Sequence, residues 1–178
     1  MTVPIPEIPN SLLARPLDYL LADHFSQRQL LTIITRLRED CTDWREAAKI
    51  AVDYLETAMP LHYADEETGL FPTLEDRCLP EDGLEALLTR LRAEHIEGDR
   101  SARRIMRDLR KCLRLDTQPH AHPKLPDRIA SFVKLGRLHL ALENAVLIPI
   151  ARVRLKSRDL IRLSESMRLR RSNPSTFP

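Results

Sequence analysis

The longest helical pattern in the chain lies between the turn "LPEDG" and the Pro-rich loop "DTQPHAHPKLP". Mostly apolar or small residues recur there at spacings of three and four, which is the period of one face of an α-helix. This seam consists of Leu84, Leu88, Leu91, His95, Gly98, Ala102, Ile105 and Leu109. We therefore expect one long helix over about residues 84–115, with one buried face.

The same pattern predicts helices elsewhere in the chain. Four further helices are expected, over about residues 17–39, 43–70, 127–156 and 157–171. Thr42 is in position to cap the helix expected over residues 43–70. Pro60 is expected to kink this helix, which should end before Pro72. The chain contains only four glycines and is rich in the helix formers Leu, Ala, Arg and Glu, so an all-α protein is expected.

The lengths of the helices and loops indicate how the helices pack. Four long helices joined by short or moderate loops favour an antiparallel up-down four-helix bundle. At 178 residues, the chain suits a single domain with a hydrophobic core. We therefore expect one domain over residues 1–178, with the bundle at about 11–156 and a short extra helix and polar tail at 157–178.

The cysteines and the charge balance exclude several classes of protein. Cys41, Cys78 and Cys112 are odd in number and form no CxxC pair, which argues against a disulfide framework or a thiolate zinc site. The net charge of +2 gives no whole-chain field that would favour nucleic acid. No signal peptide is recognisable, and no apolar run approaches the roughly 18 residues of a membrane span. We therefore expect a cytoplasmic protein.

Polar residues interrupt the apolar seams of the four long helices. Each seam contains one histidine, and in two of the helices a glutamate follows one turn later. These residues are His24, His62 with Glu66, His95, and His139 with Glu143. Four of the six histidines thus fall mid-helix on an expected buried face. A lone histidine there is ordinarily a core residue bonded to a neighbour, so a purely structural bundle is one interpretation.

The cost of burying these groups favours a metal site. An unpaired buried polar group costs on the order of 1–3 kcal/mol, and an isolated carboxylate costs far more. A cation cluster would satisfy the four imidazoles and two carboxylates together, and the spacing of four lets each His–Glu pair reach one centre. These nitrogen and oxygen ligands suit iron, manganese or zinc, and the set contains no cysteine for an iron–sulfur cluster.

The sequence around these residues resembles a known family. The matching sequence segments are "LLADHFSQRQLL", "LHYADEETGLFP", "LRAEHIEGD" and "HLALENAVLIPIA". In order and approximate spacing they resemble the bacterial hemerythrin-like proteins, or hemerythrin HHE cation-binding domain, over about residues 11–155. The resemblance implies a four-helix bundle with two non-heme iron ions bridged by Glu66 and Glu143, and zinc or manganese are the alternative metals. It implies that the remaining ligands are His24, His62, His95 and His139.

The resemblance also implies a protein that binds or reacts with O2, NO or peroxide, in stress response or sensing. Classical members have a histidine where this chain has Asp99, and an aspartate where it has Asn144. One metal ion would therefore lack a ligand unless Asp99, Tyr63, Glu67 or water supplies it. Such an open position favours redox reactivity over simple reversible O2 carriage. No catalytic residue is assigned, and enzymatic activity is left open.

The alternative function is a non-catalytic iron or zinc module for sensing or interaction. Residues 152–171 are rich in Lys and Arg and are expected to form a basic helix that caps the bundle or contacts a partner. Its apolar residues could also form a homodimer face, and they are Leu160, Ile161, Leu163 and Met167. His120 and His122 are expected in a solvated loop. No membrane partner and no nucleic-acid partner is expected.

Overall fold

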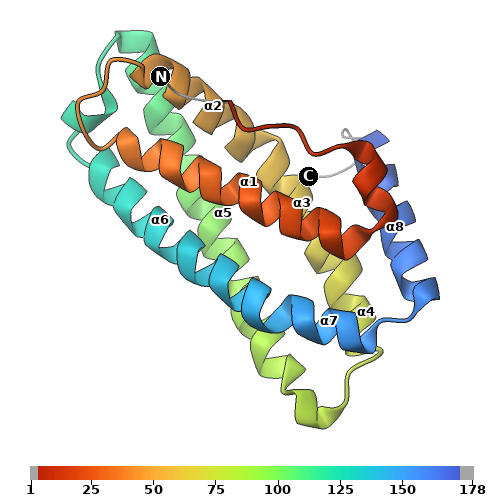
Figure 1. The fold of residues 1–178 in the computed structure, drawn as a ribbon. Helices are drawn as coiled ribbons and strands as arrows, with labels where there is room; N and C mark the ends of the chain where they lie inside the picture. The colour runs from red at the N-terminus through yellow and green to blue at the C-terminus, as the bar shows by residue number, and fades with distance from the viewer. Residues whose placement is uncertain (1–3, 173–178) are drawn as a thin grey trace.

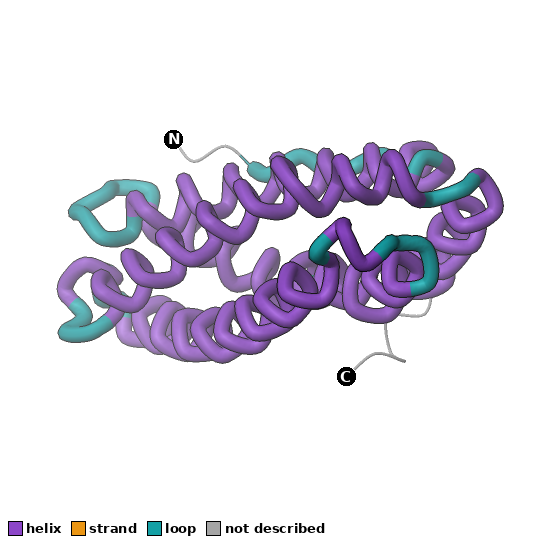
Figure 2. Tube along the Cα trace, turned by 90° about the horizontal axis from the view of Figure 1, so that it is seen from below, coloured by secondary structure: helices purple, strands orange, loops and turns teal. Residues whose placement is uncertain are grey.

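The structure is a computed structural model that describes residues 4–172. It is all-helical, as the sequence predicts, and no β-strand occurs between residues 4 and 172 (Figure 2). The first residues of the N-terminal lead-in, 1–3, and the end of the polar tail, 173–178, lie outside the described residues. Within the described range, no helix is long and apolar enough to cross a membrane.

The described helices group into four long rods and one shorter helix, and Figure 1 shows how they are arranged. The α-helices are α1 (Pro16–Arg36), α2 (Trp44–Glu56), α3 (Ala58–Asp65), α4 (Phe71–Glu75), α5 (Leu84–Leu115), α6 (Leu125–Leu142), α7 (Ile148–Arg154) and α8 (Ser157–Ser172). π-Helical turns at Glu66–Leu70 and Glu143–Leu147 join α3 to α4 and α6 to α7, so α2–α4 and α6–α7 each follow one rod. Short 3-10 helices occupy Asn10–Ala14, Pro80–Asp82 and Pro119–Ala121.

The predicted bounds agree best where no proline interrupts the helix. The bounds of α5 coincide with the expected residues 84–115, and α8 ends one residue beyond the expected 157–171. The prediction for the second helix was wrong in one respect, because the helix passes through Pro72 to end at Glu75. The interruption expected from Pro60 occurs at Thr57, three residues before the proline. Proline has no N–H to bond the carbonyl four residues earlier, which explains why α2 ends at Glu56, four residues before Pro60.

The expected N-cap of the second helix was also wrong. Asp43, not Thr42, occupies the N-cap position of α2, and its side chain makes no capping hydrogen bond.

The four rods enclose two apolar clusters. Helix α1 packs against α2 and α6, and α5 packs against the same two helices (Figure 1). The first cluster lies around the α2 end of the molecule and includes Ile34, Ile105 and Leu109. The second lies around α4, α7 and α8 and includes Phe71 and Leu147. On each rod, the histidine and glutamate positions fall between residues of the first cluster and residues of the second, so the polar layer separates them.

Helix α8 packs against α1 and α3. Its Leu163 and Met167 are buried within the chain, whereas Ile161 is exposed. Ion pairs hold the last turn of α8 to Asp65. Arg170 donates a hydrogen bond to Asp65 Oδ1 at 2.7 Å, and Arg171 donates one to Asp65 Oδ2 at 2.6 Å. The basic C-terminal helix is therefore fastened to α3 directly beside residue 66.

Candidate metal centre

All six side chains that the seams single out come together in one buried layer. They form two groups of four that could each hold a metal ion, and within each group the ligand atoms lie within 4.8 Å of one another. The first group is His24, His62, Glu66 and Glu143, and the second is Glu66, His95, His139 and Glu143. Glu66 and Glu143 belong to both groups, as expected of bridging carboxylates.

Both shared glutamates begin a π-helical turn. The N–H of Phe71 bonds the carbonyl of Glu66, and the N–H of Ile148 bonds the carbonyl of Glu143, which is the wider spacing of a π-helix. A proline follows each of these donors, at 72 and 149, and its ring would clash with a carbonyl in a regular α-turn. The wider turn accommodates that proline within a continuous rod. The repeated spacing of histidine, glutamate and proline thus gives the two glutamates the same local backbone.

The ε-nitrogens of the histidines point toward the glutamates. His24 Nε2 lies 3.4 Å from Glu143 Oε2, and His95 Nε2 lies 3.3 Å from Glu66 Oε2. The Nε2 atoms of His95 and His139 lie 3.2 Å apart. Both oxygens of each glutamate are nevertheless buried without a partner in hydrogen-bond geometry, and so is His24 Nε2. Metal ions would satisfy these orphaned donor atoms, which supports the fit of the residues to a metal pair.

The δ-nitrogens face outward, and each lies close to a carboxylate or amide oxygen on a neighbouring rod. The pairs are His62 with Asp23 at 3.1 Å, His95 with Glu67 at 2.8 Å, His139 with Glu94 at 2.9 Å, and His24 with Asn144 at 3.1 Å. An imidazole that donates its Nδ1–H leaves the Nε2 lone pair for a metal. The acceptors form a closed ring around the four rods and orient all four rings inward.

Asp23 and Glu94 were not predicted from the sequence to take part in the site, and Asn144 was considered only as the residue in place of an aspartate. Each of the four acceptors is the immediate neighbour in sequence of a ligand candidate, yet it bonds the histidine of a different rod. In the sequence, such an acceptor can therefore be recognised as an acidic or amide residue directly beside a histidine or glutamate of the seam. Tyr54 extends the ring by donating its hydroxyl to Asp23 Oδ1 at 2.8 Å.

Asp99 and Tyr63, two residues suggested for the missing ligand position, lie in different places relative to the candidate metal site. Asp99 is about half exposed and bonded to Arg103 at 2.8 Å, outside both four-residue groups. Tyr63 stacks on the ring of His95, with centroids 4.2 Å apart, and Phe71 stacks on His95 at 5.7 Å. Both aromatic rings thus fix the plane of His95.

The comparison with protein-family models agrees with this site. The model described as "Hemerythrin HHE cation binding domain" matches residues 15–151. The chain belongs to this hemerythrin family. Comparisons with curated proteins and with solved structures gave no match. Family membership means a cation-binding domain, and the buried His/Glu layer is the part of this hemerythrin domain that could hold the cation.

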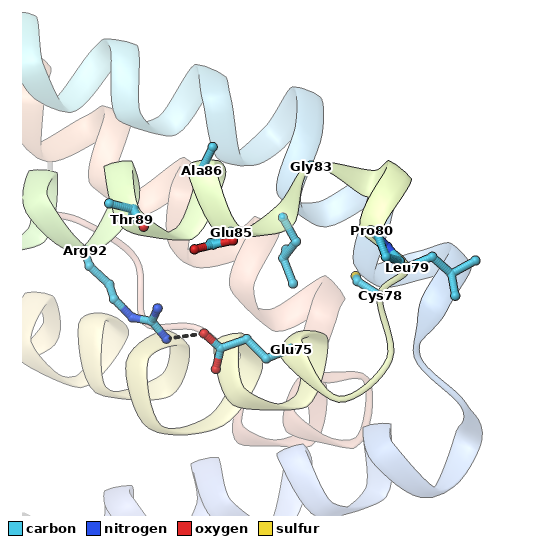
Figure 3. A pocket seen from close by; sticks show the side chains of 10 residues that line it. Glu75, Cys78, Leu79, Pro80, Gly83, Glu85, Ala86, Thr89 and Arg92 are labelled. Carbon is cyan, nitrogen blue, oxygen red and sulfur yellow. Dashed lines mark hydrogen bonds and ion pairs between the residues drawn. The ribbon is translucent and has the colours of Figure 1, made fainter.

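A hollow at the α4–α5 corner is distinct from the centre of the hemerythrin domain. It has a volume of about 530 Å³, and its lining contains none of the six ligand candidates (Figure 3). Arg92 bonds Glu75 across this hollow at 2.9 Å. The same side chain lies 3.5 Å from Glu67, which accepts from His95. Two side chains, Arg92 and Glu67, thus link this hollow to His95.

Two of the histidines hold protons tightly when no metal is present. Burial would lower the pKa of His62, but the charge of Glu66 and the hydrogen bond to Asp23 outweigh it and raise the pKa to about 9. Burial likewise opposes the charged form of His95, but the nearby carboxylates of Glu143, Glu66 and Glu67 raise the pKa to about 11. The metal-free layer is thus held together by shared protons.

The pKa values of the other groups of the layer shift in both directions. Burial opposes the charged form of His139, but the hydrogen bond to Glu143 and its charge raise the pKa. Burial, as the dominant cause, lowers the pKa of His24. For Glu143, burial acts to raise the pKa, but the imidazoles of His139 and His95 hold it well below its usual value. The carboxylate is therefore ionised and available to a metal across the neutral pH range.

We expect metal binding to strengthen as pH rises, because metal must displace these protons. The raised pKa values of His62 and His95 stabilise the metal-free fold below pH 6.5, and that contribution is lost as pH rises through about 9 and about 11. Each displaced proton should tighten the apparent Kd about tenfold per pH unit between pH 6 and 8. Calorimetry with Zn2+ in two buffers of different ionisation enthalpy would count the released protons. A Kd independent of pH would contradict this assignment.

Proposed function

We propose that this protein holds two metal ions, iron in the first place, in a centre that binds or reacts with O2, NO or peroxide. The observation that carries the proposal is the pair of four-residue groups that share Glu66 and Glu143. Their buried and unpartnered oxygens supply negative charge toward the positions where the ions would lie. Family membership supports cation binding by the same layer.

The ligand count supports a reactive centre. Each group offers two imidazoles and two shared carboxylates, which leaves positions open on an ion that prefers six ligands. Bound iron would supply the redox chemistry. The protein's own contribution is to orient the four imidazoles through the outer ring of acceptors and to exclude bulk water with the two apolar clusters.

We also propose that the rods form the antiparallel up-down four-helix bundle. The order of the two apolar clusters along the chain supports it. In α1 and α5 the chain passes from the second cluster, through the polar layer, to the first cluster. In α2–α4 and α6–α7 it passes the layer in the opposite order. Neighbouring rods therefore run in alternating directions.

The test is to load purified protein with iron, quantify the metal, and record the absorption spectrum in air and under NO. We expect about two iron ions per chain, with charge-transfer bands that change on addition of NO or peroxide. Removal of the metal by a chelator should lower the melting temperature. Fewer than about 0.5 iron per chain after loading would refute the iron centre. Tight binding of zinc without redox-active iron would favour the non-catalytic module instead.

A further inference from the structure

A small cavity adjoins the candidate ligands, and His139 is part of its lining. Its volume is about 20 Å³. A cavity of roughly 10–15 Å³ on this measure already holds one water, so this one admits a molecule of very few atoms. Several lining residues are three or four positions from a candidate histidine on the same rod, namely Gln27, Met59, Gly98, Leu135 and Gly136. Because such residues are neighbours on one helix face, the cavity is the layer next to the centre.

Two glycines lie on the wall of this cavity. Gly98 and Gly136 are two of the chain's four glycines, and both lie inside long helices. Glycine in a helix interior costs roughly 1 kcal/mol relative to alanine. A Cβ at Gly98 would lie 2.5 Å from the hydroxyl oxygen of Tyr63, and one at Gly136 would lie 3.2 Å from Leu31. The two glycines therefore leave room for side chains that line the cavity.

One side chain on this wall has an unused hydrogen-bond donor. Gln27 is 6 % exposed, and its amide nitrogen is buried without a partner. By contrast, Glu94 and His139 on the same wall are bonded to each other at 2.9 Å. An unsatisfied buried donor costs about 1–3 kcal/mol, so a group that accepts its hydrogen bond would be stabilised in the cavity.

We propose that Gln27 is a specificity-determining residue that donates a hydrogen bond to a small anion bound at the metal centre. The anion would have two or three heavy atoms, the class that includes deprotonated peroxide. The size of the cavity excludes larger molecules, and the amide donor favours an anion over a neutral diatomic such as NO. This inference rests on the proposed metal centre and adds the residue that selects its ligand.

Azide is a suitable probe, because it is a small linear anion. The experiment titrates azide and, separately, NO into the iron-loaded wild-type protein and the Gln27→Leu variant. We expect the azide Kd of the variant to rise about tenfold, which corresponds to about 1.4 kcal/mol, while the NO affinity stays within about twofold. The infrared stretch of bound azide should also shift, because its hydrogen bond is lost. Iron content should not change.

Gln29→Leu is the matched control, since Gln29 lies on the same helix, has a buried amide oxygen without a partner, and does not line the cavity. It should leave the azide Kd unchanged. Gln27→Met, which keeps an unbranched side chain of similar length, replaces Gln27→Leu if the latter loses iron or fails to fold.

Three results would overturn the inference. An unchanged azide Kd would mean that Gln27 serves only a buried water. An equal loss of azide and NO affinity would mean that Gln27 acts through the metal ligands and not on the bound anion. A wild-type protein that retains iron but binds no azide would reject this inference and leave the metal centre standing. Failure of the wild type to retain iron would reject both.

Discussion

Replacing Glu66 by glutamine is expected to remove metal from both halves of the centre at once. Glu66 is fully buried and belongs to both four-residue groups, so a neutral amide weakens each group by one anionic ligand. Metal content after loading and desalting should fall from about two ions per chain to below about 0.5, measured by elemental analysis. The Glu143→Gln variant should behave in the same way.

Two controls separate this effect from unfolding. His24 belongs only to the first group, so His24→Ala should spare the second ion. Glu75→Gln changes a glutamate that bonds Arg92 outside both groups and should retain both ions. The metal-free Glu66→Gln and wild-type proteins should each show one cooperative transition in urea denaturation, which separates loss of metal from loss of the fold. Retention of two ions by Glu66→Gln would contradict the shared-ligand arrangement.

Removal of the Asp65 carboxylate should cause the largest loss of stability among single changes outside the centre. Asp65 is fully buried and receives hydrogen bonds from Arg170 and Arg171, and the Arg170 side chain is only 4 % exposed. Breaking a buried pair from one side leaves an uncompensated charge and costs about 3–5 kcal/mol. Urea denaturation of Asp65→Ala should therefore show the free energy of unfolding lowered by about that amount.

A surface pair provides the comparison for Asp65→Ala. Asp99 and Arg103 are both well exposed, so Asp99→Ala should change the free energy of unfolding by less than about 1 kcal/mol. Adding Arg170→Met to Asp65→Ala should recover part of the loss, because it removes the unpaired charge. If Asp65→Ala proves as mild as Asp99→Ala, then α8 is not held to α3 by this buried pair.

The sequence was sufficient to locate the six candidate ligands because their positions follow from helix periodicity. One histidine interrupts each apolar seam, and a face that recurs every three or four residues is visible without tertiary information. The bounds of α5 were also predictable from local sequence alone. A turn precedes that helix and a Pro-rich loop follows it, and no proline interrupts it.

The π-helical turns and the outer ring of hydrogen-bond acceptors could not be predicted from helix periodicity, because they depend on contacts between rods. Local sequence propensity predicts that the helix ends before Pro72. In the structure, the π-helical turn that begins at Glu66 lets the rod continue past this proline. Asp23 and Glu94 are sequence neighbours of His24 and His95, but each bonds the histidine of the following rod. Their partners are set by the register between rods, which a single helix pattern cannot specify.

The division of the ligands along the chain gives the metal ions a mechanical role. The segment before the turn at Pro80–Asp82 supplies His24, His62 and Glu66, and the segment after it supplies His95, His139 and Glu143. Neither segment contains a complete group, because each group takes one glutamate from the other segment. Bound ions would therefore cross-link the two halves of the polypeptide and close long loops between them. In a chain cleaved at that turn, bound metal would add to the packing that keeps the two fragments together.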